Sequence, residues 1–227
     1  MDLPVWQTLY EELKDKNFVV VSVAFDTGGA ADAGQWIQKA NPTYPCLIDE
    51  RHLVAELYDM VNVPNAVWID EQRRIVRPAE PAGASDAFRG MDPKTLRLPE
   101  EAVAGLRRKR QVYQDALRDW ADKGSASIHA LPPAEVRRRA RGPTDEHALA
   151  ATHFRLGVYL HERGHADAAQ QHFDEAKRLR PESWNFKRQA WTLEAPGKAG
   201  GPEFWSAVEA LGEKPYYPPI EMDGMPR

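Results

Sequence analysis

The stretch NVPNAVWIDEQRRIV, residues 62–76, is the most informative part of this 227-residue chain. Two runs rich in strand-forming residues, Ala66 to Ile69 and Arg74 to Arg77, flank the polar segment Asp70 to Arg73. Such a spacing is typical of a hairpin turn, so the pattern predicts two strands that return on each other. Pro64 stands just before the first of them, and proline commonly opens a strand.

Helices and strands alternate in the residues before this hairpin. Phe18 to Phe25 is a continuous apolar run, which predicts a strand buried on both faces. Cys46 to Ile48 predicts a second, short strand. We expect three helices around these strands, at 4–16 (with Asp2 as its cap), at 31–40, and at 52–60 with Leu53, Leu57 and Tyr58 on one side. This alternation, closed by a hairpin, is typical of an α/β fold.

The composition changes after Arg77, and the rest of the chain is mostly helical in pattern. A Pro-, Gly- and Ala-rich stretch precedes a charged amphipathic helix expected at 100–123, and a basic helix is expected at 134–141. The chain is predicted to be helical again from 147 to 194. The predicted divisions are a domain at 1–80, a linker at 81–99, a helical connector at 100–142, a second helical region at 143–195 and a Pro/Gly-rich tail at 196–227.

Charge and composition narrow the classes of partner. The net charge of -4 and the pI near 6.0 give no reason to expect binding to nucleic acid or to an anionic membrane. No apolar run approaches the length of about 20 residues that a membrane helix needs. The sequence holds one cysteine, which rules out an internal disulfide framework.

Two long runs carry a resemblance to a known family. MDLPVWQTLYEELKDKNFVVVSVAFDT, residues 1–27, and YPCLIDERHLVAELYDMVNVPNAVWIDEQRRIVRP, residues 44–78, resemble TlpA/ResA-like thiol-disulfide oxidoreductases of the redoxin (AhpC/TSA-related) group. The resemblance implies a thioredoxin-like fold, a cis peptide bond before Pro64, and a backbone at Val63 that pairs with an extended substrate. It also implies dithiol-disulfide exchange with a protein partner, without a cofactor.

This chain departs from the family at its most important point, because it contains no Cys-x-x-Cys. The resemblance implies that the motif, and the central strand that leads into it, would stand just before Met1. Without that strand its two neighbours would keep unpaired edges, which favours aggregation. We therefore expect a misplaced start, with the redox pair (cysteines, or selenocysteine and cysteine) upstream and no catalytic residue in residues 1–227.

Two consequences of this departure stay open. If the chain begins at Met1 as written, it is a non-catalytic thioredoxin-fold protein that binds partners. Its compartment is then cytoplasmic, whereas a signal or anchor lost with the upstream segment would place it outside the cytoplasm. Cys46 is not expected to act alone, because it lies in a predicted buried strand and is interpreted as a small packed apolar residue.

The segment from Ala150 to Pro181 resembles a tetratricopeptide repeat. Small, large and helix-ending residues fall at that repeat's spacing, at Leu156, Gly157, Leu160, Gly164, Ala169, Phe173, Ala176 and Pro181. One clear repeat is fewer than the number that usually folds alone, so it should pack on the helices at 100–141 or on the redox domain. Binding of a peptide or partner protein and a purely structural helical cap are both open interpretations.

One formal motif in this segment is a zinc-peptidase signature, His161-Glu162-Arg163-Gly164-His165. The motif works only where one continuous helix places both histidines on one face. Gly164 should end that helix, so His165 is expected in the turn. Neither the pair nor a looser cluster with His172 is predicted to bind a metal, since no third ligand is identifiable beyond the candidates Glu175 and Glu182. The run Arg137 to Arg139 is interpreted as a solvated helix face.

Overall fold

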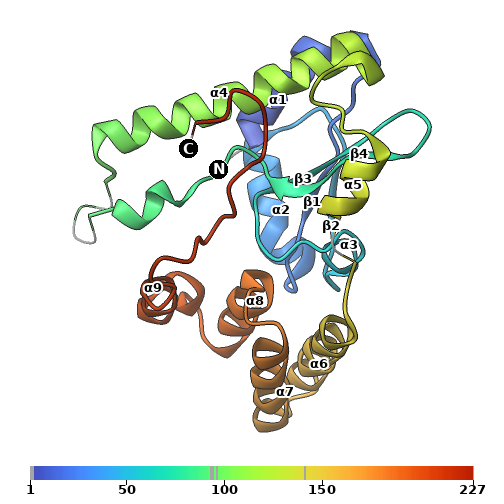
Figure 1. The fold of residues 1–227 in the computed structure, drawn as a ribbon. Helices are drawn as coiled ribbons and strands as arrows, with labels where there is room; N and C mark the ends of the chain where they lie inside the picture. Colours follow the sequence, from blue (N-terminus) through green and yellow to red (C-terminus); the bar gives the residue numbers. More distant parts are fainter. Residues whose placement is uncertain (1–2, 93–94, 96, 141, 227) are drawn as a thin grey trace. The chain divides into compact units, whose positions relative to one another are not determined.

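The computed structural model describes residues 3–92, 95, 97–140 and 142–226, so Asp2, the expected cap, lies outside the described residues. The chain forms two compact units that are interleaved along the sequence (Figure 1). The first unit comprises Met1–Glu12, Val19–Asn62 and Arg141–Ser206, and the second comprises Leu13–Phe18, Val63–Ala140 and Ala207–Arg227. Among the described residues, no helix is both long and apolar enough to cross a membrane.

The first unit contains a parallel pair of short strands. β1 (Ser22–Ala24) pairs with β2 (Cys46–Ile48) in the register Ser22↔Cys46 to Ala24↔Ile48. The strands run parallel because the chain crosses back between them through a helix. The helices of this part are α1 (Leu3–Leu13), α2 (Gly29–Ala40) and α3 (Leu53–Leu57).

The prediction of a long strand buried on both faces was wrong. β1 covers three residues of the run from Phe18 to Phe25, and the side chains of Val19 and Val21 are 62% and 51% exposed. The physical reason is the strand's environment: β2 covers one edge of β1, and no described strand pairs with the other. An apolar run becomes a buried central strand only when both neighbours are present.

Helix α3 also differs from the expectation, in its length and in the face that it buries. Asp49 fixes its start, since the Asp49 carboxylate accepts hydrogen bonds from the backbone N–H groups of Leu53 and Val54 at 3.0 and 2.7 Å. Ala55 is buried, and residues two positions away from it lie on the opposite face of a helix. Leu53 and Leu57 are therefore exposed.

The rest of the first unit is helical. α6 (Asp145–Glu162) and α7 (Ala166–Leu179) form a helical hairpin, followed by α8 (Trp184–Glu194). Gly157 allows the close approach of the pair, because a Cβ atom there would lie 2.6 Å from the Phe173 ring. The hairpin and α8 share a core of small and aromatic side chains, Ala150, Ala151, Phe154, Ala169, Phe173, Ala176, Phe186 and Ala190.

These helices contact the N-terminal part of the same unit. This is one of the two locations expected from the sequence, because it lies within the predicted domain at 1–80. The backbone N–H groups of Trp184 and Asn185 donate to the Val61 carbonyl at 2.7 and 3.1 Å. At the other end of α8, the Gln189 side chain accepts from the Thr27 backbone N–H at 3.0 Å. The unit continues through a short 3-10 helix (Lys198–Gly200) into α9 (Pro202–Glu209).

The second unit is built on an antiparallel hairpin. β3 (Asn65–Ile69) pairs with β4 (Ile75–Pro81) from Asn65↔Pro81 to Ile69↔Ile75, with register shifts on either side of Trp68. The turn is closed by a hydrogen bond of 2.9 Å from the Asp70 N–H to the Arg74 carbonyl, which confirms the predicted hairpin. Besides short 3-10 helices at Lys14–Lys16 and Gly124–Ala126, the unit holds α4 (Glu100–Lys123) and α5 (Pro133–Arg139).

Composition suggests a loose linker at 81–99 and a loose tail at 196–227, yet both have ordered parts. The first contains a 3-10 helix, Asp86–Gly90, and the second contains α9 and the buried side chains of Tyr216, Ile220 and Met222. The Asp86 carboxylate links them, since it accepts hydrogen bonds from the backbone N–H groups of Tyr216 and Tyr217. The domain boundaries at 80, 99, 142 and 195 stay a prediction.

Candidate functional site

The loop before β3 is the candidate substrate site. The Val63–Pro64 peptide bond is cis, the geometry that the family resemblance implies. Val63 is 40% exposed, whereas the Pro64 carbonyl is turned into the hairpin, where it accepts from the Ala82 N–H at 3.3 Å. The loop is thus fixed on its β3 side and accessible at Val63.

The Val63 carbonyl has a side-chain neighbour from the C-terminal segment. The hydroxyl of Tyr217 donates to it at 2.8 Å. Sequence reasoning missed this contact, because nothing in a Pro- and Gly-rich tail indicates which loop it will reach.

A buried polar cluster holds the hairpin behind this loop. The Arg77 side chain is 1% exposed and forms a two-pronged ion pair with Glu80, at 2.8 and 2.9 Å. Its guanidinium also lies 5.3 Å from the centre of the Trp68 ring. Trp68 in turn donates to the hydroxyl of Tyr113 at 2.9 Å, and burial raises the pKa of that hydroxyl well above its ordinary value.

Cys46 lies on β2 in the first unit. Its sulfur accepts a hydrogen bond from the Ser22 hydroxyl at 2.9 Å, across the β1–β2 pair. The side chain is half-buried, so the expected fully packed environment is only partly realised. Since the sequence contains no other cysteine, these 227 residues cannot form a dithiol-disulfide couple among themselves.

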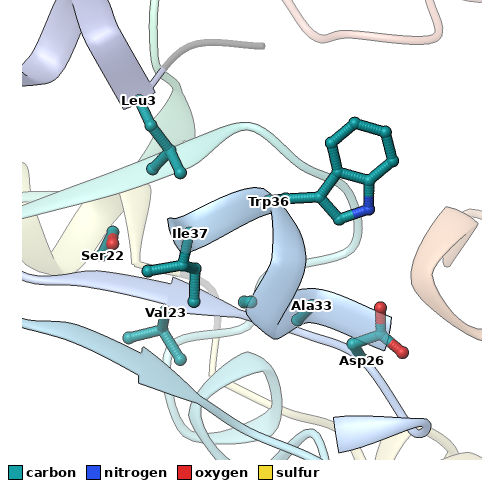
Figure 2. A pocket seen from close by; sticks show the side chains of 8 residues that line it. Leu3, Ser22, Val23, Asp26, Ala33, Trp36 and Ile37 are labelled. Carbon is teal, nitrogen blue, oxygen red and sulfur yellow. The ribbon is translucent and has the colours of Figure 1, made fainter. Parts of the chain in front are cut away.

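A cavity of about 270 Å³ opens beside β1. Figure 2 shows the side chains that line it, which come from α1, β1, α2 and, at Asp26, the loop between β1 and α2. The lining is mainly apolar, formed by Leu3, Ser22, Val23, Ala24, Asp26, Ala33, Trp36 and Ile37. Burial raises the pKa of the Asp26 carboxyl, although the Gly28 N–H that donates to it at 3.0 Å acts in the opposite direction.

This cavity is large enough for a small apolar group. Its residues are scattered from position 3 to position 37 without a motif, so no sequence signal would have identified it. Trp36 is 49% exposed, which is unusual for so large an apolar side chain and gives the cavity an aromatic rim.

The histidines do not form the arrangement that a zinc-peptidase site requires. His161 lies on α6, Gly164 has a φ of +77°, and His165 lies in the turn before α7, as the sequence predicts. His172 faces His153 across the helical hairpin, with 2.8 Å between their Nδ1 atoms, and so is paired outside the suggested cluster. No group of three metal-ligating side chains occurs among the described residues.

His52 is a buried titratable residue that sequence reasoning missed. It is 3% exposed and lies between Phe25 and Phe154, with its ring centre 5.7 and 5.2 Å from theirs. Neither ring nitrogen has a hydrogen-bond partner within the described ranges. Burial lowers its pKa to about 4, against a smaller opposite effect of Asp49.

Comparison with known protein families gives a match for the first third of the chain. Residues 2–77 match the AhpC/TSA family model. The matched segment includes β1, β2, the Val63–Pro64 loop and most of the hairpin, and a largely helical remainder follows it. No curated protein and no solved structure matches the chain.

Proposed function

We propose that the redoxin segment takes part in thiol-disulfide exchange of the TlpA/ResA-like type, with the Val63–Pro64 loop holding an extended protein substrate. The observation that carries this proposal is the match of residues 2–77 to the AhpC/TSA family. The exposed backbone at Val63 supports it, because an extended peptide is recognised mainly through main-chain hydrogen bonds.

The exchange itself needs a redox pair from outside residues 1–227. A thiolate attacks one sulfur of the substrate disulfide and releases the other as a thiol, which leaves a mixed disulfide. A second thiol then attacks the mixed disulfide, so that two electrons and two protons pass from the pair to the substrate. Cys46 alone supplies one sulfur, and its hydrogen bond from Ser22 supports a structural role.

For the helical region we propose a structural cap. The contacts that support it are those of α8 with Val61 and Thr27, together with the insertion of Phe154 against His52. A tetratricopeptide-like role in partner binding would use the surface left exposed on the same hairpin, which includes Leu156 and Tyr159.

The test is to sequence the coding DNA upstream of the Met1 codon and to express the chain with any in-frame segment found there. We expect an apolar strand that ends in Cys-x-x-Cys, or in selenocysteine-x-x-Cys. The extended chain should accelerate the reduction of insulin by dithiothreitol. An upstream stop codon without such a segment would contradict the proposal and would favour the non-catalytic binding protein.

A further inference from the structure

The C-terminal segment of residues 212–222, here named the strap, lies in the second unit and contacts the candidate substrate loop. It falls in the red part of the chain in Figure 1. Its contact with the loop is the hydrogen bond of 2.8 Å from the Tyr217 hydroxyl to the Val63 carbonyl. A role for this contact rests on the proposed function, in which the Val63 carbonyl pairs with an extended substrate.

The N-terminal end of the strap is held by the 3-10 helix Asp86–Gly90. The Asp86 carboxylate accepts from the backbone N–H groups of Tyr216 and Tyr217 at 2.8 and 2.6 Å. Arg89 donates to the carbonyls of Gly212 and Lys214 at 2.7 and 3.1 Å. Hydrogen bonds to charged groups are about twice as strong as those between neutral groups, so this end is firmly anchored.

The C-terminal end of the strap is held by arginines of β4 and α5. Arg77 and Arg139 both donate to the Glu221 carbonyl, at 3.1 and 2.8 Å. The neighbouring side chains of Ile220 and Met222 are each 9% exposed. The strap is therefore fixed on both sides of Tyr217.

The contact made by Tyr217 is weaker than these anchors. It is a hydrogen bond between neutral groups, and its partner Val63 is partly exposed. A neutral hydrogen bond contributes little net free energy, since water competes for both groups. The tyrosine can leave the carbonyl while both ends of the strap stay in place.

We infer that the strap is an intramolecular competitor for the substrate, because the Tyr217 hydroxyl occupies the Val63 carbonyl with which the N–H of an extended substrate would pair. The apparent affinity for extended peptides is then the intrinsic affinity multiplied by the fraction of molecules in which this carbonyl is free of Tyr217.

The test uses the 227-residue chain and the insulin B chain with its cysteines carboxymethylated, an extended peptide that cannot exchange disulfides. Isothermal titration calorimetry compares the wild type with Tyr217→Phe, which keeps the ring contacts with Phe88 and Tyr216 and removes only the hydroxyl. Tyr10→Phe in α1 of the first unit is the matched control, since it also removes one hydroxyl and keeps the ring contact, here with Tyr44. Hydrogen-deuterium exchange over residues 60–66 locates the bound peptide.

We expect Tyr217→Phe to bind the peptide more tightly, by between about twofold and tenfold, and Tyr10→Phe to bind like the wild type. Equal affinity of the wild type and Tyr217→Phe would overturn the competitor role while leaving the substrate site in place. Weaker binding by Tyr217→Phe would also overturn it, since the hydroxyl would then contact the peptide. If no variant binds and residues 60–66 gain no protection, the substrate role of Val63 itself fails, and the inference fails with it.

Discussion

The two strand pairs of this protein lie in or next to the segment that matches the AhpC/TSA family model, yet they are held in different ways. β3 and β4 form a hairpin whose polar anchor, Arg77, is almost completely buried. β1 and β2 form a three-residue pair with an unpaired edge, and beside them His52 lies between two phenylalanine rings without polar partners among the described residues. In the hairpin, the backbone groups of β3 and β4 form hydrogen bonds with each other across a short turn. In contrast, β1 depends on a strand that is distant in the sequence.

The largest effect is expected from breaking the anchor of the hairpin. Arg77→Met should lower the free energy of unfolding by about 3 to 5 kcal/mol, because it leaves the Glu80 carboxylate nearly buried without its counter-charge. Urea unfolding followed by tryptophan fluorescence measures this loss. The control is Arg178→Met in α7, where both partners of the ion pair with Glu175 are exposed, at 66% and 34%. A similar loss in both variants would show that burial is not what makes the anchor important.

The next effect is a pH dependence of the free energy of unfolding, which we expect from His52 beside the β1–β2 pair. Above pH 6.5 the His52 ring is neutral in both the folded and unfolded states, so it adds no pH dependence. Between pH 6.5 and 4 the unfolded chain binds a proton that the folded chain does not, and the free energy of unfolding should fall by roughly 3 kcal/mol as the pH falls. Below pH 4 the decrease attributable to His52 should level off.

Urea unfolding at a series of pH values tests this expectation in His52→Leu. The variant should lose most of the decrease between pH 6.5 and 4, while His165→Leu, in an exposed histidine, should keep it. Identical pH profiles for His52→Leu and the wild type would contradict the assignment.

A smaller effect is expected in the α6–α7 hairpin of the first unit. Gly157→Ala should destabilise the protein by about 1 to 2 kcal/mol, because the new Cβ would lie 2.6 Å from the ring of the buried Phe173. Gly105→Ala in α4 is the matched control, since nothing lies within 4 Å of its Cβ position. There the gain in helix propensity should raise the midpoint of thermal unfolding. Stabilisation by both substitutions would mean that α6 and α7 are further apart than described.

The smallest effect on stability is expected at Val21, which directly precedes β1. Val21→Thr should change the free energy of unfolding by no more than about 0.5 kcal/mol, because half of this side chain is already in water. Thermal unfolding is sufficient to measure it. A loss of about 2 kcal/mol or more would mean that the apolar face of this run is covered in solution, and the contrast between the strand pairs would disappear.

Features that depend on local sequence could be predicted. Helix α4 begins after Pro99 and ends at Gly124, where proline and glycine punctuate a continuous amphipathic pattern. The hairpin turn and the helix break at Gly164 depend on equally local signals. The cis bond before Pro64 was predicted from the family resemblance and not from a local pattern.

Features that depend on long-range neighbours could not be predicted. The exposure of Val19 depends on which strands lie beside β1, and the exposure of Leu57 depends on which face of α3 buries Ala55. The contact of Tyr217 with Val63 joins residues 154 positions apart. The apolar site of His52 is formed by Phe25 and Phe154, which no local pattern connects.

The most direct measurement is an insulin reduction assay on the 227-residue chain with dithiothreitol, comparing the wild type with Cys46→Ser. If these residues form a substrate platform without redox chemistry of their own, both proteins should leave the rate of insulin precipitation at the value for dithiothreitol alone. Acceleration by the wild type that disappears in Cys46→Ser would contradict this, because it would identify Cys46 as the nucleophile.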